Sequence, residues 1–223
     1  MMKQVYALIL MIGLAAMSVG AAEEWVDITP DADMTEWVQR GGDAKYAVEN
    51  GVVIGSSVPN TGNSFLCTKK EYGDFILEFE FMSHPDLNSG VQIRSESKPD
   101  YKDGRVHGYQ IELEQESQVR DWSGGIYDEA RRGWLEPKKD DEEAVKKFSE
   151  VGVKIWKEGE WNTIHVEAKG NRIRTWVNGE PRANLRDDMT PKGFIALQVH
   201  GVGDNAEPMS IKWRNIRIQE LSE

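Results

Sequence analysis

The segment DFILEFEFMS, residues 74–83, decides the fold class of this chain. Apolar residues alternate with glutamates in it, and the two sets are Phe75, Leu77, Phe79 and Phe81 against Glu78 and Glu80. A period of two places one set on each face of a β-strand. The segment therefore predicts a strand that buries one face and turns the other toward water.

The same alternation recurs through the rest of the chain, in segments separated by turn signals. The further predicted strands lie in residues 90–95, 108–116, 161–181, 193–201 and 210–221. Asn50-Gly51 and Asn178-Gly179 supply the positive φ angles of tight hairpin turns. Together these signals predict an all-β chain, an antiparallel sandwich of two sheets. The charged segment KKDDEEAVKKFSE, residues 138–150, predicts a short helix in an insertion.

The N-terminus has the pattern of a secretory signal peptide, which we assign to residues 1–22. Lys3 precedes an apolar run over residues 5–16, and small residues follow at 20–22. The run is shorter than the ~20 residues of a spanning helix, so we expect cleavage rather than anchoring. We expect a periplasmic or secreted single domain, residues 23–223, with no membrane span after cleavage.

The net charge and the cysteine content limit which partners, disulfides and metal ions the chain can have. The formal charge is −11, and residues 1–22 hold one Lys and no acid, so the mature chain carries −12. This argues against nucleic acid and anionic membranes as partners. The single cysteine, Cys67, has no partner for an internal disulfide. No zinc-ligand spacing is present, and acidic loops such as 204–208 and 84–90 could hold a structural calcium, the one cofactor suggested.

Three predicted strands carry unusual side chains on the polar face. Amide, guanidinium, carboxylate and imidazole groups bind sugar hydroxyls and transfer protons. The outward residues of this kind are Gln92 and Arg94, then Gln110, Glu112 and Glu114, then Gln198 and His200. If the sheet is concave, they line a trough. The alternative is a plain solvated face with cross-strand pairs such as Arg94 with Glu112.

The loop WSGGIYDEARRGW, residues 122–134, favours a binding trough. Flat aromatic rings stack on the C–H faces of sugars, which suggests a wall built by Trp122, Tyr127 and Trp134. Hydrogen bonds at the rim would come from the charged residues of the loop, Asp128, Glu129, Arg131 and Arg132. We therefore expect a carbohydrate substrate.

Several segments together resemble the 3-keto-disaccharide hydrolase family. The specific features are SGGIYDEARRGWL, residues 123–135, followed by LQVHG, residues 197–201, and the resemblance runs from about Trp25 to the C-terminus. It implies a concanavalin A-like jelly roll and a secreted or periplasmic hydrolase acting on glycosides oxidised at C3. Such a substrate implies functional dependence on a sugar C3 oxidoreductase.

The chemistry of a 3-keto-glycoside assigns roles to the trough. A ketone at C3 acidifies the C2 proton, a base removes it, and the enolate expels the group at C1 before water adds. We expect Glu112 or His200 to be the base and the other to protonate the leaving group. Arg94, Gln92 and Gln198 are the expected enolate donors. Gln110 is expected to bind substrate.

Two other functions fit the same residues. A retaining glycosidase of the laminarinase type would use the strand pair Glu112 and Glu116, whose carboxyls must approach to roughly 5 Å. A carbohydrate-binding module would need only the aromatic wall and the amides. A pH profile separates catalysis from binding, because only catalysis needs a titrating group.

Overall fold

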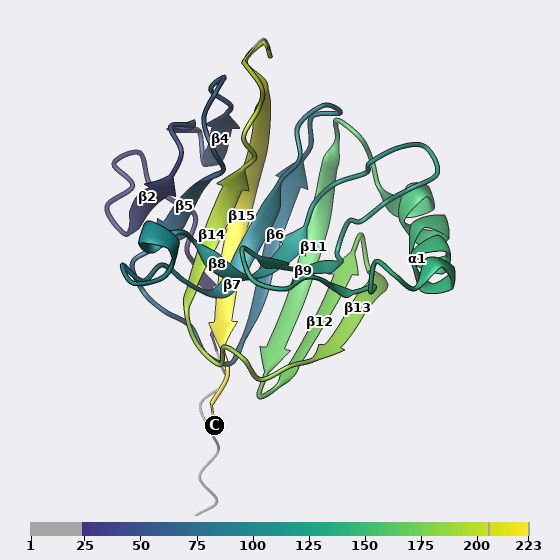
Figure 1. Cartoon of the computed structure of the whole chain (residues 1–223). Coiled ribbons are helices and arrows are strands. Elements are labelled where there is room, and N and C mark those ends of the chain that lie inside the picture. Colours follow the sequence, from purple (N-terminus) through teal and green to yellow (C-terminus); the bar gives the residue numbers. More distant parts are fainter. Residues whose placement is uncertain (1–23, 205, 223) are drawn as a thin grey trace, which may run out of the picture.

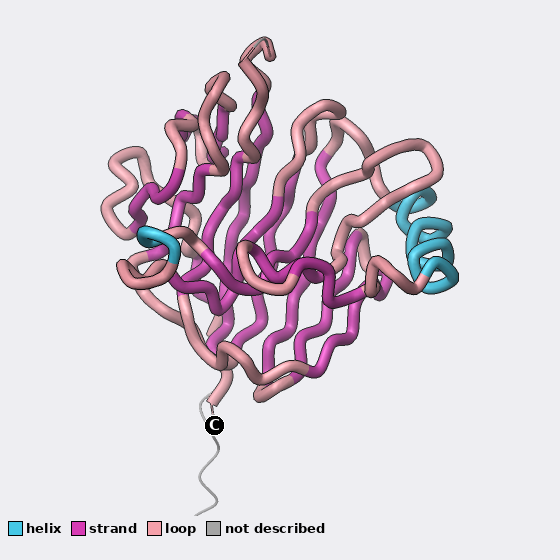
Figure 2. The backbone as a smooth tube through the Cα atoms, viewed as in Figure 1, coloured by secondary structure: helices cyan, strands magenta, loops and turns pink. Residues whose placement is uncertain are grey.

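The structure is a computed structural model that describes residues 24–204 and 206–222. The predicted signal peptide lies outside the described residues. Two antiparallel sheets dominate the described chain (Figures 1 and 2). Buried residues of both sheets join in one apolar cluster, so the core lies between the sheets. The predicted two-sheet antiparallel sandwich is therefore confirmed.

The first sheet has eight strands. In spatial order they are β13 (Glu180–Arg186), β12 (Arg172–Val177), β11 (Trp161–Lys169), β6 (Phe75–Met82), β15 (Ser210–Glu220), β4 (Val52–Ser56) and β3 (Lys45–Glu49), with β1 (Val26–Asp27) also paired to β15. The segment 74–83 forms β6 at the centre of this sheet. Its phenylalanines and Leu77 are 0–1% exposed, and its glutamates are half-buried, as the alternation predicts.

The second sheet has seven strands and carries the candidate site. In spatial order they are β10 (Gly133–Glu136), β9 (Ile126–Glu129), β8 (His107–Glu112), β7 (Gly90–Glu96), β14 (Phe194–Val199), β5 (Ser64–Thr68) and β2 (Trp37–Gly41). Every residue of β8 and β14 is buried. The outer face of this sheet is therefore covered rather than freely solvated, and its polar side chains lie in a sheltered environment.

The predicted helix is also present. Helix α1 (Glu142–Ile155) begins where the Asp141 carboxylate accepts a hydrogen bond from the Ala144 amide, and it lies beside the β12–β13 edge (Figure 1). A 3₁₀ turn (Lys102–Gly104) precedes β8. Within the described ranges, no helix has the length and apolar character needed to cross a bilayer.

Candidate active site

A cavity of about 470 Å³ lies on the outer face of the second sheet. It is built by β8, β9, β10, β14 and the loops beside them. The lining residues are Asn63, Asn88, Arg105, Gln110, Glu112, Glu114, Glu116, Trp122, Tyr127, Glu129, Ala130, Trp134, Lys139, Gln198 and His200. Strand alternation explains part of this set: Gln110 and Glu112 are two residues apart on β8, and so share a face. We call this space the main cavity.

The Glu112 carboxylate is held by amide groups. Asn88 Nδ2 donates to Glu112 Oε1 over 2.8 Å, and Gln110 Nε2 donates to Glu112 Oε2 over 3.0 Å. Gln110 is fixed in turn, because its Oε1 accepts from Gln92 Nε2 at 2.5 Å and from Gln198 Nε2 at 2.9 Å. This network leaves Glu112 few orientations. It makes Glu112 the best-positioned acid–base group of the cavity.

Burial changes the proton affinity of Glu112. The side chain is 3% exposed. Desolvation, followed by the nearby charge of Glu114, raises the pKa of Glu112 from 4.5 to about 8, although hydrogen bonds from Gln110 and Asn88 act in the opposite direction. Burial also raises the pKa of Glu114. A carboxyl that titrates near neutral pH in a cavity is suited to general acid–base chemistry.

The aromatic residues of the 122–134 loop meet in one cluster. The rings of Trp122 and Trp134 stack with centroids 4.1 Å apart, and Tyr127 meets Trp134 edge-on at 5.4 Å. Trp122 is almost fully buried, and its Nε1 donates to Glu116 Oε2 over 2.6 Å. Trp122 therefore supports the wall from behind, while the half-buried Trp134 and Tyr127 offer more surface to a ligand.

His200 lies at the mouth of the main cavity, directly after β14. Its side chain is exposed, and its Nδ1 lies 2.8 Å from the Gly201 carbonyl oxygen. A carbonyl only accepts, so Nδ1 carries the hydrogen of this bond. In the neutral ring, Nε2 is then free to accept a proton.

A family model described as the 3-keto-alpha-glucoside-1,2-lyase-like domain matches residues 24–219. The chain belongs to this family. The family predicted from the sequence is thereby confirmed. Among curated proteins, no sequence matches the chain.

Solved structures of similar shape support the fold of this lyase-like domain. A candidate glycosyl hydrolase from Parabacteroides distasonis is 20% identical with a TM-score of 0.58, covering 89% of this chain and 94% of its own. Porphyranase B from Zobellia galactanivorans is 13% identical with a TM-score of 0.54, covering 90% and 94%. Carbohydrate binding module CBM66 from Bacillus subtilis is 14% identical with a TM-score of 0.51, covering 83% and 96%. The jelly-roll fold is shared; the identities are too low to show more.

The prediction that Arg94 faces the trough of the lyase-like domain is wrong. The pairing of β7 shifts register between Ile93 and Glu96, and Arg94 has a φ of 44°. This bulge interrupts the alternation of the strand. The Arg94 guanidinium instead donates to the carbonyl oxygens of Gly73 and Gly170, each over 2.7 Å, and pairs with Asp74 at 2.8 Å. It is buried against the chain before β6 and the turn between β11 and β12, so it does not pair with Glu112 either.

The predictions for Asp128, Arg131 and Arg132 are also wrong. Strand β9 turns Tyr127 and Glu129 toward the main cavity, so Asp128 between them points away and is fully buried. Its carboxylate accepts from the Nε atoms of both Arg131 and Arg132. Arg131 Nη1 also donates to the Thr190 hydroxyl over 2.7 Å. These residues tie the loop after β9 to the segment before β14, and they do not themselves line the main cavity.

The remaining predicted residues separate into two groups. Glu112, His200, Gln110, Gln198, Trp122, Tyr127 and Trp134 all line the main cavity of the lyase-like domain. Gln92 does not. It lies behind Gln110, where the Ser95 hydroxyl donates to its Oε1 over 2.8 Å. Gln92 therefore positions Gln110 rather than contacting a ligand.

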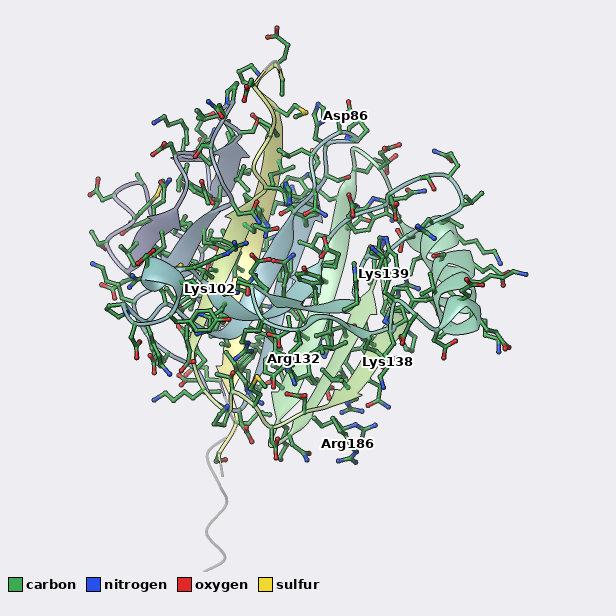
Figure 3. The ribbon with its side chains drawn as sticks, viewed as in Figure 1. Asp86, Lys102, Arg132, Lys138, Lys139 and Arg186 are labelled. Atoms are coloured by element: carbon green, nitrogen blue, oxygen red, sulfur yellow. The ribbon has the colours of Figure 1, made fainter. Side chains whose placement is uncertain are left out.

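Sequence reasoning missed several residues of the cavity. Arg105 Nη2 pairs with Glu129 Oε1 at 3.0 Å, and both line the main cavity. Glu129 itself was expected at the rim, and it shares a face with Tyr127 because the two are two residues apart on β9. Asn88 and Lys139 carry no such signal, because they lie in loops outside the alternating pattern of the strands. Figure 3 labels Lys139 near the middle of the view, in the loop before α1.

Among residues 24–204 and 206–222, no group of three or more His, Cys, Asp or Glu is arranged to hold a metal ion. The calcium suggested by the acidic loops therefore remains a sequence prediction. The main cavity does contain carboxylates, but amide and indole donors bond to Glu112 and Glu116.

Gly90 makes room for the Gln110 side chain, which gives a sharp test of the amide network. A Cβ at Gly90 would lie 2.5 Å from Gln110 Cδ, too close for both to keep their places. We expect Gly90→Ala to displace Gln110 and to lower kcat/KM by about 10²-fold, as misplaced catalytic groups do. Steady-state kinetics measures this. Gly62→Ala is the matched control, since a Cβ there meets nothing within 4 Å; equal activities of the two variants would contradict the role of the network.

Proposed function

We propose that this protein cleaves glycosides that carry a ketone at C3. A base removes the C2 proton, and the C–H electrons form an enolate with the C3 carbonyl. The enolate re-forms the ketone and expels the oxygen at C1, which leaves as an alcohol after gaining a proton. Water then adds across the C1=C2 bond. The observation that carries the proposal is the buried, amide-held Glu112 with a pKa of about 8 in a domain of the 3-keto-alpha-glucoside-1,2-lyase-like family.

Glu112 takes the role of base, and His200, with a proton on Nε2 as well as on Nδ1, that of acid. A raised pKa makes the Glu112 carboxylate a stronger base, which favours removal of a weakly acidic C–H proton. His200, at the cavity mouth, reaches the group that departs toward solvent. With Arg94 placed elsewhere, Arg105 and Lys139 are the cavity's cations, and they and the Gln198 amide would stabilise the enolate oxygen. Trp134 and Tyr127 would stack on the sugar ring.

The proposal includes the setting of the reaction. We propose that the mature chain acts in the periplasm or outside the cell, in keeping with the signal-peptide pattern of residues 1–22. A sugar C3 oxidoreductase must supply the substrate, because the ketone that acidifies C2 is absent from ordinary glycosides.

Sugar binding without catalysis is the second candidate function. The stacked pair Trp122–Trp134 would serve it equally well, and CBM66 shares the fold. The retaining-glycosidase alternative is less favoured. Strand β8 ends at Glu112, so Glu116 lies in the following loop, where its carboxylate accepts from the Trp122 indole.

One substrate comparison tests these functions. Residues 23–223 are purified and incubated with a 3-keto-glucoside and with the matching unoxidised glucoside, with and without a chelator. We expect sugar release from the keto form alone, since only its C2 proton is acidic. Release from the unoxidised glucoside would favour the Glu112/Glu116 glycosidase. Binding of either sugar without any release would leave a lectin-like module, and loss of activity with chelator would establish a metal requirement.

A further inference from the structure

A cavity of about 490 Å³ lies on the outer face of the first sheet, across the sandwich from the main cavity. We call it the basic cavity. Ile173 of β12 is buried in the core, so Arg172 and Arg174 on either side of it face outward into this cavity. Lys169 of β11 and Arg186 of β13 complete a set of four cations in its lining. Figure 3 labels Arg186 near the lower edge of the molecule.

The acids of the basic cavity are already engaged. Glu167 forms an ion pair with Arg174. Asp74 Oδ1 accepts from Arg94 Nη2 over 2.8 Å, and both Asp74 oxygens accept from the Gly170 amide over 3.0 Å. These are the two acids among the described residues of the lining, so neither is left to neutralise the other cations.

Three cations of the basic cavity therefore keep unpaired charges. Within residues 24–204 and 206–222, Lys169, Arg172 and Arg186 form no ion pair. The Arg172 guanidinium donates only to the Asn184 side-chain oxygen over 2.8 Å, and that of Arg186 only to the Asn171 side-chain oxygen over a long 3.4 Å. Asparagine is neutral, so these bonds orient the guanidinium groups and leave their charge in place.

The three unpaired cations stand in one row across three strands. Lys169 is the register partner of Arg172, and Arg172 is that of Arg186. Neighbouring strands lie ~4.8 Å apart, so the row is about 10 Å long. Like charges directly opposite each other destabilise a sheet. The row therefore lowers the stability of the empty protein, and an anion bound across it would recover the loss.

The surroundings of the row restrict the anion. The chain carries a formal charge of −11, so a long polyanion such as nucleic acid would be repelled outside the cavity. The cavity volume equals roughly sixteen water molecules at ~30 Å³ each, far more than one inorganic ion occupies. The Asn171 amide and the apolar side chains of Ile76 and Leu221 also line it. Amides bind hydroxyl groups and apolar groups contact the C–H faces of rings, as a sugar requires.

We infer that the basic cavity is a second glycan-binding site, which takes a short segment of an anionic glycan through the sulfate or carboxylate groups of its sugars. Guanidinium groups bind both kinds of anion through paired hydrogen bonds. The site is separate from the main cavity and does not depend on the proposed reaction. It would hold the protein on a charged glycan by the face opposite the main cavity.

Calorimetry at about 50 mM salt, where screening is weak, tests the site with a sulfated disaccharide, digalacturonate, cellobiose and inorganic sulfate. We expect both anionic disaccharides to bind. Lys169→Gln with Arg186→Gln should weaken their binding at least tenfold and leave any binding of cellobiose unchanged. Lys45→Gln with Lys192→Gln is the matched control, because it removes the same charge from exposed positions that do not line the cavity. It should change the affinities less than twofold.

Several results would contradict the site. Absence of binding, binding that survives Lys169→Gln with Arg186→Gln, or equal losses in both variant pairs would each overturn it. Inorganic sulfate that binds as tightly as the disaccharides would leave an ion site, and tighter binding of a phosphoserine peptide would make the partner a protein. Either of these results overturns the glycan assignment.

Thermal unfolding without ligand gives an independent readout and shows that the variant folds. Arg186→Gln should raise the melting temperature by about 1–2 °C relative to Lys45→Gln, because it relieves repulsion from Arg172. A lower melting temperature would show that Arg186 stabilises the empty protein, which contradicts an unpaired row.

Discussion

Glu112→Gln should lower kcat/KM for the 3-keto-glucoside by about 10²–10⁴-fold, the range that a positioned general base contributes. Glutamine keeps the size of the side chain but cannot take the C2 proton. The pH profile of kcat/KM for the natural protein should contain a titration near pH 8 that Glu112→Gln removes, because the base acts only when ionised and burial raises the pKa of Glu112 to about 8. Steady-state kinetics between pH 5 and pH 10 measures both effects.

Two comparisons make this prediction specific. Glu116→Gln should cost far less activity, since Glu116 supports Trp122 rather than accepting a proton; equal losses would favour the retaining glycosidase.

The pH dependence of folding stability gives a second measurement of the Glu112 pKa. Between 4.5 and about 8 the unfolded chain releases a proton that folded Glu112 keeps, so the free energy of unfolding should fall as pH rises through this window. Urea unfolding at pH 5 and pH 8 should show a smaller fall in Glu112→Gln. An identical fall would contradict the raised pKa.

Asp121→Ala should lower the free energy of unfolding by about 3–5 kcal/mol, because it leaves a buried charge without its partner. Asp121 Oδ1 accepts from Arg182 Nη2 over 2.9 Å, and both side chains are 0–1% exposed. Arg182 lies on β13. It also donates to the Ser123 carbonyl and to the Phe148 carbonyl of α1, each over 2.8 Å. The pair therefore joins the loop of residues 122–134, the edge strand β13 and helix α1. Urea unfolding monitored by circular dichroism measures the loss.

The matched controls separate this buried pair from ordinary ion pairs. Glu143→Ala breaks the exposed Glu143–Lys147 pair of α1 and should cost about 0.5 kcal/mol or less. The double variant Asp121→Asn with Arg182→Met should be more stable than Asp121→Ala, because it removes both charges. If Asp121→Ala costs no more than Glu143→Ala, the pair does not stabilise the loop.

The fold was predictable because burial on one face of a strand leaves a period of two in the sequence. Strand β6 shows this directly, since its apolar residues meet the core and its glutamates do not. Within the site, Gln110, Glu112 and Gln198 were found for the same reason. They occupy the face opposite Ile111, Leu197 and Val199, which are buried in the core. The aromatic wall was found because three large rings in a glycine-containing loop need a common surface to pack on.

The sequence by itself determined the antiparallel sandwich, the family, and many of the polar and aromatic residues that line the main cavity. Tertiary structure alone decided three further features. A bulge in β7 turned Arg94 away, because one extra residue breaks the alternation on which its prediction depended. The alternation of side chains along β9 places Asp128 in the interior, where two arginines pair with its carboxylate. Asn88 and Lys139 reach the site from the loops before β7 and after β10, whose course no local sequence pattern predicts.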